Sequence, residues 1–141
     1  MIFVPYNFLH HAQWIKEHIK CTICEDTLGI VALRDGEIVA AMVADSWAHN
    51  SVQVHIAIKD PLVFKHGMHF EFFDWIFNKT GRGVMLALIP ANNAKALKLN
   101  EHLGFTEFAR IPDGFRVGED FIARQLRKES CKYINQNEEV A

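Results

Sequence analysis

Cysteine is scarce in this chain of 141 residues, which has only Cys21, Cys24 and Cys131. An odd and sparse set does not build a disulfide framework, so we expect reduced thiols in a cytoplasmic protein. Cys21 and Cys24 form a C-x-x-C pair, but no second such pair and no clean H-x(3–5)-H pair follows to complete a zinc site. We interpret the two as incidental thiols.

The sequence also lacks a long apolar run and an excess of basic charge. Lys, Asp or His recurs throughout, so no stretch approaches the roughly 20 apolar residues of a membrane-spanning helix. The first residues, MIFVPYNFLHH, have no basic segment and do not fit a secretion signal. A formal net charge of -2 gives no overall basic field for nucleic acid. We expect a soluble protein that binds neither membrane nor nucleic acid.

Carboxylates are absent at ligand spacing from the eight histidines. His10, His11 and His18 share one segment, and His66 and His69 stand three residues apart. Metal sites built on histidine need further ligands at matching positions. Ordinary surface or partly buried histidines are therefore a better interpretation, and no metal is expected.

What is present is the composition of one globular domain. Hydrophobic residues make up 50% and charged residues 23%, near the averages of about 45–50% and about 25%. The length lies within the roughly 50–250 residues of a typical domain. Apolar periodicity is lost in the last segment, KESCKYINQNEEVA. We expect a single domain over residues 1–126 and a flexible tail over residues 127–141.

The first half predicts a helix followed by three antiparallel strands. Asn7 is a suitable N-cap for a helix over residues 8–20, where apolar residues recur at near-helical intervals. Two strands follow over residues 28–33 and 38–44, joined by the turn pair Asp35-Gly36. A third strand over residues 52–58 alternates apolar and other residues at period two.

The second half predicts helix, strand, helix and two strands. MHFEFFDWIFNK is apolar on nearly every side, as in a buried helix, and VMLALIP fits a strand covered on both faces. Asn92 or Asn93 caps the next helix, which ends at Gly104. FTEFARIP and EDFIARQL read as strands separated by a loop at residues 113–118. The fold class is α/β in the α+β sense, a mixed and mostly antiparallel sheet with one parallel crossover.

The segment NAKALKLNEHLGF, residues 93–105, resembles the last conserved block of the GCN5-related N-acetyltransferase (GNAT) superfamily. That block is roughly N-x-x-A-x-x-x-Y-x-x-x-G-F, and Asn93, Ala96, Gly104 and Phe105 match it in register. The strands before and after the segment stand where the family has its fifth and sixth strands. The resemblance covers about residues 8–126 and implies the family's central sheet with flanking helices.

The resemblance implies acetyl-CoA as co-substrate. In the family, the fourth and fifth strands run parallel and splay apart, and the pantetheine arm hydrogen-bonds to the fourth strand. Here this strand is residues 52–58, which assigns Ile56, Ala57 and Ile58 to the pantetheine. Asn93 matches a position close to the same arm.

A loop of the pattern R/Q-x-x-G-x-G/A holds the pyrophosphate in the family, where clustered N–H groups and the helix dipole attract the anion. This chain has PLVFKHGMHF instead. Lys65, His66 and Gly67 supply a cation, one glycine and a helix start, and are assigned to the cofactor. His69 stands at the second glycine position.

The catalytic groups implied by the resemblance differ in part from the usual set. Asn100 occupies the position of the tyrosine that many members use as general acid; it has no titrating proton but can hydrogen-bond a thiolate. His55 is the best candidate for the base, since histidine titrates near neutral pH. A plain sheet-face role for His55 is the favoured alternative. Glu101 and Glu119 qualify by residue type, but their spacing places neither at the site.

Three functions stay open. The first is acetyl-CoA-dependent transfer of an acetyl group to an unidentified small-molecule or protein amine. The second is a catalytically inactive GNAT-fold scaffold, which the glycine-poor loop, Asn100 and the aromatic-rich helix favour. The HIAI segment, the buried aromatic helix and the N-x-x-A…EHLGF segment together resemble GNAT-like chains of tailed bacteriophages, some of which are labelled head-assembly or virion accessory proteins. That alternative implies a protein partner in phage assembly, a place in the host cytoplasm, and tail contacts through Tyr133 and Ile134. The third is a module that binds a pantetheine ligand without turnover. A homodimer is a further option.

Overall fold

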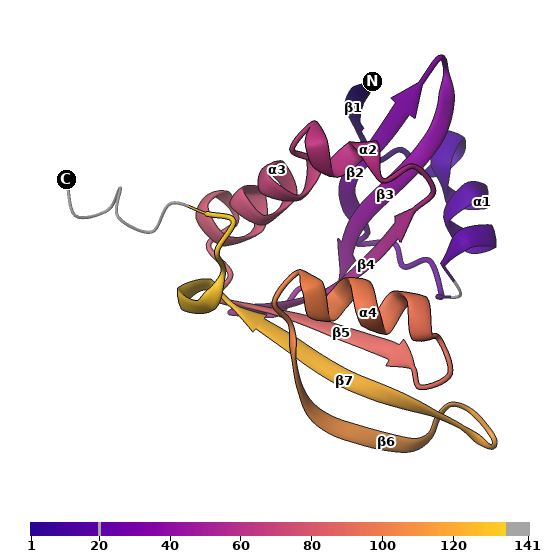
Figure 1. Ribbon diagram of the computed structural model, residues 1–141, viewed down its shortest axis with the longest axis vertical. Coiled ribbons are helices and arrows are strands. Elements are labelled where there is room, and N and C mark those ends of the chain that lie inside the picture. Colours follow the sequence, from indigo (N-terminus) through magenta and orange to yellow (C-terminus); the bar gives the residue numbers. More distant parts are fainter. Residues whose placement is uncertain (20, 135–141) are drawn as a thin grey trace.

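A seven-stranded sheet runs through the protein in the order β1-β2-β3-β4-β5-β7-β6 (Figure 1). The computed structural model describes residues 1–19 and 21–134. All neighbouring strands are antiparallel except β4 and β5, which are parallel. The strands are β1 (Ile2–Pro5), β2 (Leu28–Arg34), β3 (Glu37–Asp45), β4 (Ser51–Ile58), β5 (Val84–Pro90), β6 (Thr106–Arg116) and β7 (Glu119–Arg127). The predicted mixed, mostly antiparallel sheet is confirmed.

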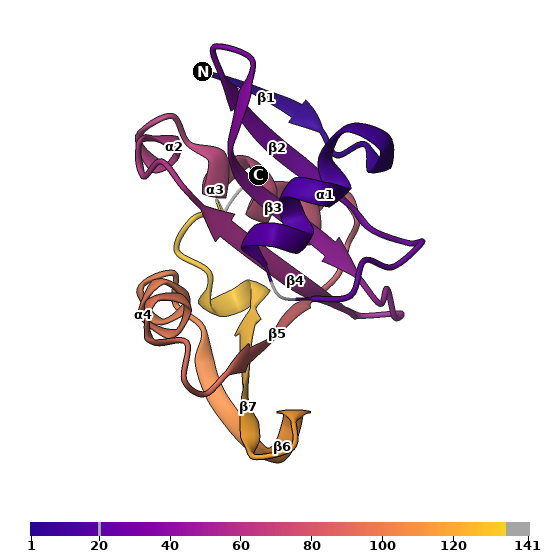
Figure 2. The ribbon, with the colours of Figure 1, turned by 90° about the vertical axis from the view of Figure 1, so that its right-hand side faces the viewer.

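Helices cover both faces of this sheet (Figure 2). One face carries α1 (Phe8–His18), and the other carries α2 (Leu62–Lys65), α3 (Met68–Asp74) and α4 (Ala94–His102). A π-helical turn, Trp75–Lys79, extends α3. The predicted caps are present: Asn7 Oδ1 accepts from the N–H of His10 at 3.3 Å, and Asn93 Oδ1 from that of Ala96 at 3.1 Å. Both helices therefore begin where the sequence places them.

The central strand β3 is buried on both faces, which explains its continuous apolar sequence. Along β3, Ala41 and Val43 pack with Ile15 of α1, whereas Met42 belongs to the core under α3. The largest side chains of that second core come from α3 and its extension and have at most 1% exposure: Phe72, Phe73 and Phe77. The aromatic helix is thus buried, as the sequence predicts, and its rings fill the larger of the two cores.

The parallel pair β4–β5 is short and then separates. Only Ser51–Gln53 of β4 pairs with Val84–Leu86 of β5. Beyond this point β4 continues beside β3 and β5 continues beside β7, so the two halves of the sheet diverge (Figure 1). The end of β4 therefore has no strand partner on the side of β5.

Several boundaries differ from the sequence-based expectation. The first helix ends at His18 because Ile19 is extended, and Lys20 lies outside the described residues. The predicted loop at residues 113–118 is wrong in its first part, since β6 continues to Arg116 through an irregular register. β1 and α2 were not predicted. No helix in the described ranges is long and apolar enough to cross a membrane.

The predicted tail begins inside an element, since β7 ends at Arg127 and a 3₁₀ turn, Lys128–Ser130, follows. Cys131 is 2% exposed in the main core. The Tyr133 ring contacts that of His69 at 4.7 Å, and its hydroxyl donates to the carbonyl oxygen of His102 at 3.4 Å. This part of the chain thus joins α3 to the end of α4. Residues 135–141 of the predicted tail lie outside the described residues.

Candidate active site

His55 of β4 forms a buried pair with a carboxylate of the neighbouring strand. In the β3–β4 register Asp45 lies opposite Gln53 and Val43 opposite His55, so Asp45 and His55 are diagonal neighbours on the α1 face. His55 Nε2 lies 2.8 Å from Asp45 Oδ2, and the side chains are 11% and 4% exposed. Sequence reasoning missed Asp45, which ends an apolar strand and belongs to no recognised motif.

Asp45 is ionised at neutral pH. Burial on its own raises the pKa of this carboxyl, but hydrogen bonds and charge from its surroundings outweigh burial and hold the pKa below its ordinary value. The largest lowering contribution to the pKa is the hydrogen bond from His55, followed by the charge of that ring when it is protonated and by hydrogen bonds from Ser46 and Cys24. Ser46 donates to Asp45 Oδ1 at 3.0 Å.

The ionised carboxylate fixes the neutral tautomer of His55. A carboxylate only accepts hydrogen bonds, so Nε2 must carry the proton in the contact with Asp45. Nδ1 then bears the lone pair. No residue within 1–19 and 21–134 forms a hydrogen bond with Nδ1 of His55. This nitrogen is not fully buried. His55 therefore offers a basic nitrogen two residues beyond Gln53, where β4 and β5 separate.

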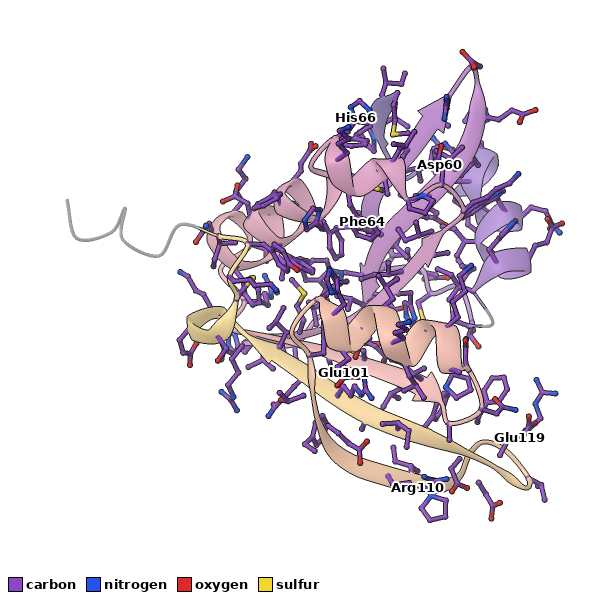
Figure 3. All side chains as sticks on the ribbon, in the orientation of Figure 1. Asp60, Phe64, His66, Glu101, Arg110 and Glu119 are labelled. Atoms are coloured by element: carbon purple, nitrogen blue, oxygen red, sulfur yellow. The ribbon has the colours of Figure 1, made fainter. Side chains whose placement is uncertain are left out.

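The predicted cofactor residues of β4 and the following loop lie near one another along the chain. Ile56, Ala57 and Ile58 form the end of β4 beyond its pairing with β5. Lys65 and His66 are exposed at the end of α2, and His66 is labelled in Figure 3. Their assignment to a cofactor stays a prediction.

The loop before α3 uses its own N–H groups. The His66 N–H donates to the Leu62 carbonyl oxygen at 3.2 Å, and the Gly67 N–H to that of Phe64 at 3.1 Å. Gly67 has a φ of 81°, a left-handed conformation that favours glycine. His69 is buried, with its ring centroid 5.1 Å from that of Phe64. The N–H groups of His66 and Gly67 are thus hydrogen-bonded to α2, whereas the loop of the GNAT family directs such groups to a pyrophosphate.

The two asparagines of α4 have different surroundings. Asn93 is the N-cap described above. Asn100 is buried, and its Oδ1 has a long contact of 3.5 Å with Nη1 of Arg124. The same Nη1 donates to the Leu97 carbonyl oxygen at 2.8 Å. The acceptor oxygen of Asn100 is thereby turned toward β7, and its proposed contact with a thiolate stays a prediction.

Neither glutamate considered as a base joins His55. Glu119 ion-pairs with Arg116 at 2.8 Å and accepts from Asn92 at 3.1 Å. Glu101 is exposed on α4. Figure 3 shows both in the half of the molecule built from α4 and β5–β7. The structure therefore brings neither glutamate to His55, which stays the candidate base.

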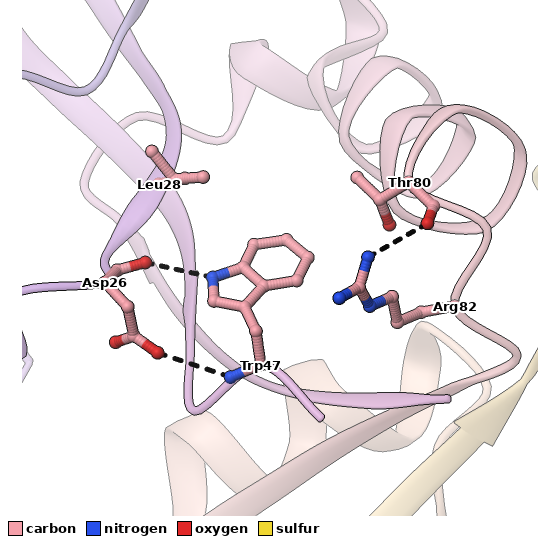
Figure 4. A pocket seen from close by; sticks show the side chains of 5 residues that line it. All are labelled: Asp26, Leu28, Trp47, Thr80 and Arg82. Atoms are coloured by element: carbon pink, nitrogen blue, oxygen red, sulfur yellow. Dashed lines mark hydrogen bonds between the residues drawn. The ribbon is translucent and has the colours of Figure 1, made fainter. Parts of the chain in front are cut away.

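Two surface pockets lie elsewhere. One of about 360 Å³ is lined by Asp26, Leu28, Trp47, Thr80 and Arg82 (Figure 4). The indole N–H of Trp47 donates to the Asp26 carbonyl oxygen at 2.9 Å, and the guanidinium carbon of Arg82 lies 5.0 Å from the centroid of the Trp47 ring. The other, of about 440 Å³, is lined by residues of α4, β6 and β7. Neither pocket includes His55.

The C-x-x-C pair lies close enough to Asp45 for the carboxylate charge to raise the pKa of both thiols. Burial, followed by the charges of Asp45 and Cys24, raises the pKa of Cys21 to about 11. Burial is also the largest cause that raises the pKa of Cys24. Both thiols are therefore poor nucleophiles at neutral pH. Across the described ranges, no three His, Cys, Asp or Glu side chains gather as a metal site.

Slow alkylation of Cys21 is the expected consequence. At pH 8 a thiol with a pKa of about 11 is roughly 0.1% thiolate, so Cys21 should react with iodoacetamide on the order of a hundredfold more slowly than free cysteine. Tandem mass spectrometry of the peptide that contains Cys21 and Cys24 gives the rate at each site. A rate at Cys21 equal to that of free cysteine would show that its surroundings are not as described.

Solved structures share this fold at low sequence identity. The spermidine N-acetyltransferase SpeG of Vibrio cholerae (N152L mutant) is similar with a TM-score of 0.65 and 18% identity, over 94% of this chain and 79% of that chain. The smu.2055 protein of Streptococcus mutans UA159 is similar with a TM-score of 0.69 and 16% identity, over 90% of this chain and 99% of that chain. A GNAT-family structure from Desulfovibrio desulfuricans is similar with a TM-score of 0.62 and 16% identity, over 82% of this chain and 77% of that chain.

The chain therefore has the fold of the GNAT acetyltransferases, as its sequence predicts. No protein-family model and no curated protein matches the chain. The bacteriophage resemblance gains no support from the structures named above.

Proposed function

We propose that the protein is an acetyl-CoA-dependent N-acetyltransferase. The observation that carries the proposal is the buried His55–Asp45 pair at the point where the parallel strands β4 and β5 separate. A fold alone does not determine a reaction, so the proposal depends on the chemistry of this pair. A neutral imidazole with one nitrogen bonded and the other free is suited to accept a proton.

The residues present fit acetyl-CoA at the end of β4. Ile56, Ala57 and Ile58 lie beyond the pairing with β5, so the backbone groups of this stretch that point away from β3 are available to a pantetheine arm. The exposed side chains of Lys65 and His66 supply donors for a pyrophosphate. Bound acetyl-CoA supplies an activated acyl group as a thioester.

His55 acts on the acceptor amine in this proposal. Its Nδ1 takes a proton from the attacking nitrogen as the new C–N bond forms and the C–S bond breaks. The electron pair of the broken bond leaves on the CoA sulfur. Asn100 is the candidate donor of a hydrogen bond to that thiolate, although its own amide oxygen is turned toward Arg124.

Spermidine is a reasonable first acceptor to test, because similar structures are named as spermidine N-acetyltransferases. The acceptor panel should also include monoamines and peptides with free N-termini. These extend the test to the small-molecule and protein amines that the proposal covers.

Calorimetric titration of acetyl-CoA into the protein tests the first requirement. Micromolar binding is expected. The Lys65→Ala variant should weaken it about fivefold, since an exposed ion pair contributes about 1 kcal/mol. Lys16→Ala is the matched control, because Lys16 is also an exposed lysine and lies on α1, away from the loop. Its affinity should equal that of the original protein.

Two outcomes would count against the proposal. If nothing binds at millimolar acetyl-CoA, the enzyme is excluded and a scaffold with this fold is the remaining explanation. If acetyl-CoA binds but no amine of the panel is acetylated, the protein is a module that holds a pantetheine ligand without turnover.

A further inference from the structure

We infer that Asp45 is a positioning residue for His55: it fixes the tautomer and ring orientation that leave Nδ1 free to accept a proton. This inference rests on the proposed function. It concerns a residue that has no counterpart in the motifs of the sequence. Asp45 touches no reacting atom in this account and acts only through His55.

The geometry holds the carboxylate in one place. Asp45 Oδ2 accepts from His55 Nε2 at 2.8 Å, and Oδ1 accepts from the Ser46 hydroxyl at 3.0 Å. The residue is 3% exposed and lies on β3, one of the central strands. The diagonal arrangement across paired strands restricts the imidazole to a narrow range of orientations.

A purely structural role explains the pair less well. Burying a carboxylate costs several kcal/mol, and apolar side chains of similar volume commonly stabilise a core at least as well. Val31, Ala41 and Val43 on this face belong to the apolar core under α1, while Gln53 lies directly opposite Asp45. A charged pair at the border of such a core, with one ring nitrogen left unpaired, is better suited to holding a base than to packing.

The other titratable groups that influence Asp45 are the thiols Cys21 and Cys24. Both have pKa values raised by burial and by the carboxylate, so both are neutral in the range where histidine titrates. Neither thiol therefore adds a second negative charge beside Asp45 at neutral pH.

Asp45→Asn is the main test. The amide can turn its NH₂ group toward Nε2, which moves the imidazole proton to Nδ1 and removes the basic lone pair. We expect kcat for acetyl transfer to fall on the order of 10- to 100-fold with KM for the amine unchanged.

Two further variants separate positioning from folding. Asp45→Glu keeps the carboxylate and should recover part of the lost kcat. Ser46→Ala removes only the second hydrogen bond of Asp45 and should change kcat less than threefold. Matching circular dichroism spectra and thermal midpoints establish which variants are folded. Equal loss of kcat in Asp45→Asn and Ser46→Ala would overturn the inference.

A measurement without turnover distinguishes a failure of this inference from a failure of the proposed function. Long-range ¹H–¹⁵N spectra of the free protein at neutral pH report the tautomer of His55. The Nε2–H form is expected, with a change toward Nδ1–H in Asp45→Asn. If the original protein shows Nδ1–H, or if Asp45→Asn retains the original kcat, the inference is wrong. If the spectra are as expected but no amine is acetylated, the proposed function fails and the pairing stands.

Discussion

Replacing His55 with glutamine is expected to lower kcat/KM for acetyl transfer by about 10²- to 10⁴-fold, the usual contribution of a general base. Glutamine can still hydrogen-bond to Asp45 but cannot take a proton from an amine. The affinity for acetyl-CoA should be unchanged, because the predicted contacts use the end of β4 and the loop after it. Steady-state kinetics and calorimetric titration on the same samples measure the two quantities.

His49→Gln is the matched control for this experiment. His49 is an exposed histidine in the connection between β3 and β4, outside the pair. Its replacement should leave both quantities unchanged. If His55→Gln retains the original kcat/KM, His55 has only its alternative role as a sheet-face residue, and the base must be sought elsewhere.

The main architecture was predictable because each element carries a local signal. The alternation from residue 52 to residue 58 predicts β4, and the asparagine caps at positions 7 and 93 begin their helices as expected. Short elements were not predictable in the same way. β1 has four residues and α2 has four, too few to show a period.

The loop predicted after Pro112 shows a different limit. Asp113 and Gly114 are turn-forming residues, and Asp113 has a φ of 57°. The chain nevertheless continues as β6, because pairing resumes between Arg116 and Glu119 after an irregular stretch. A local turn signal predicted a break, whereas long-range pairing made an irregular strand.

For the candidate site, the sequence predicted one partner of the pair. His55 stands out because it is the histidine of an alternating strand. Asp45 does not, because its meeting with His55 depends on the register of two strands, which a five-residue connection sets. The effect of Asp45 on the tautomer follows from a 2.8 Å contact that no spacing rule contains.

The packing of α3 leads to the largest expected loss of stability. Phe72 is fully buried and packs against Phe73 and Trp75, with ring centroids 6.0 and 5.9 Å away. Phe72→Ala should lower the free energy of unfolding by about 3–5 kcal/mol, because the removed ring leaves a cavity that the sheet and helix cannot close. Urea unfolding followed by circular dichroism measures this change.

Phe70→Ala is the matched control in the same helix. Phe70 is 49% exposed, and its ring contacts are with His69 at 4.5 Å and Tyr133 at 5.4 Å. Its loss should cost about 1 kcal/mol, the value of such aromatic contacts. Since α3 follows directly on the loop that contains Lys65 and Gly67, the first variant should also weaken acetyl-CoA binding near its unfolding midpoint, and the second should not. Equal destabilisation by the two substitutions would mean that α3 does not turn Phe72 inward.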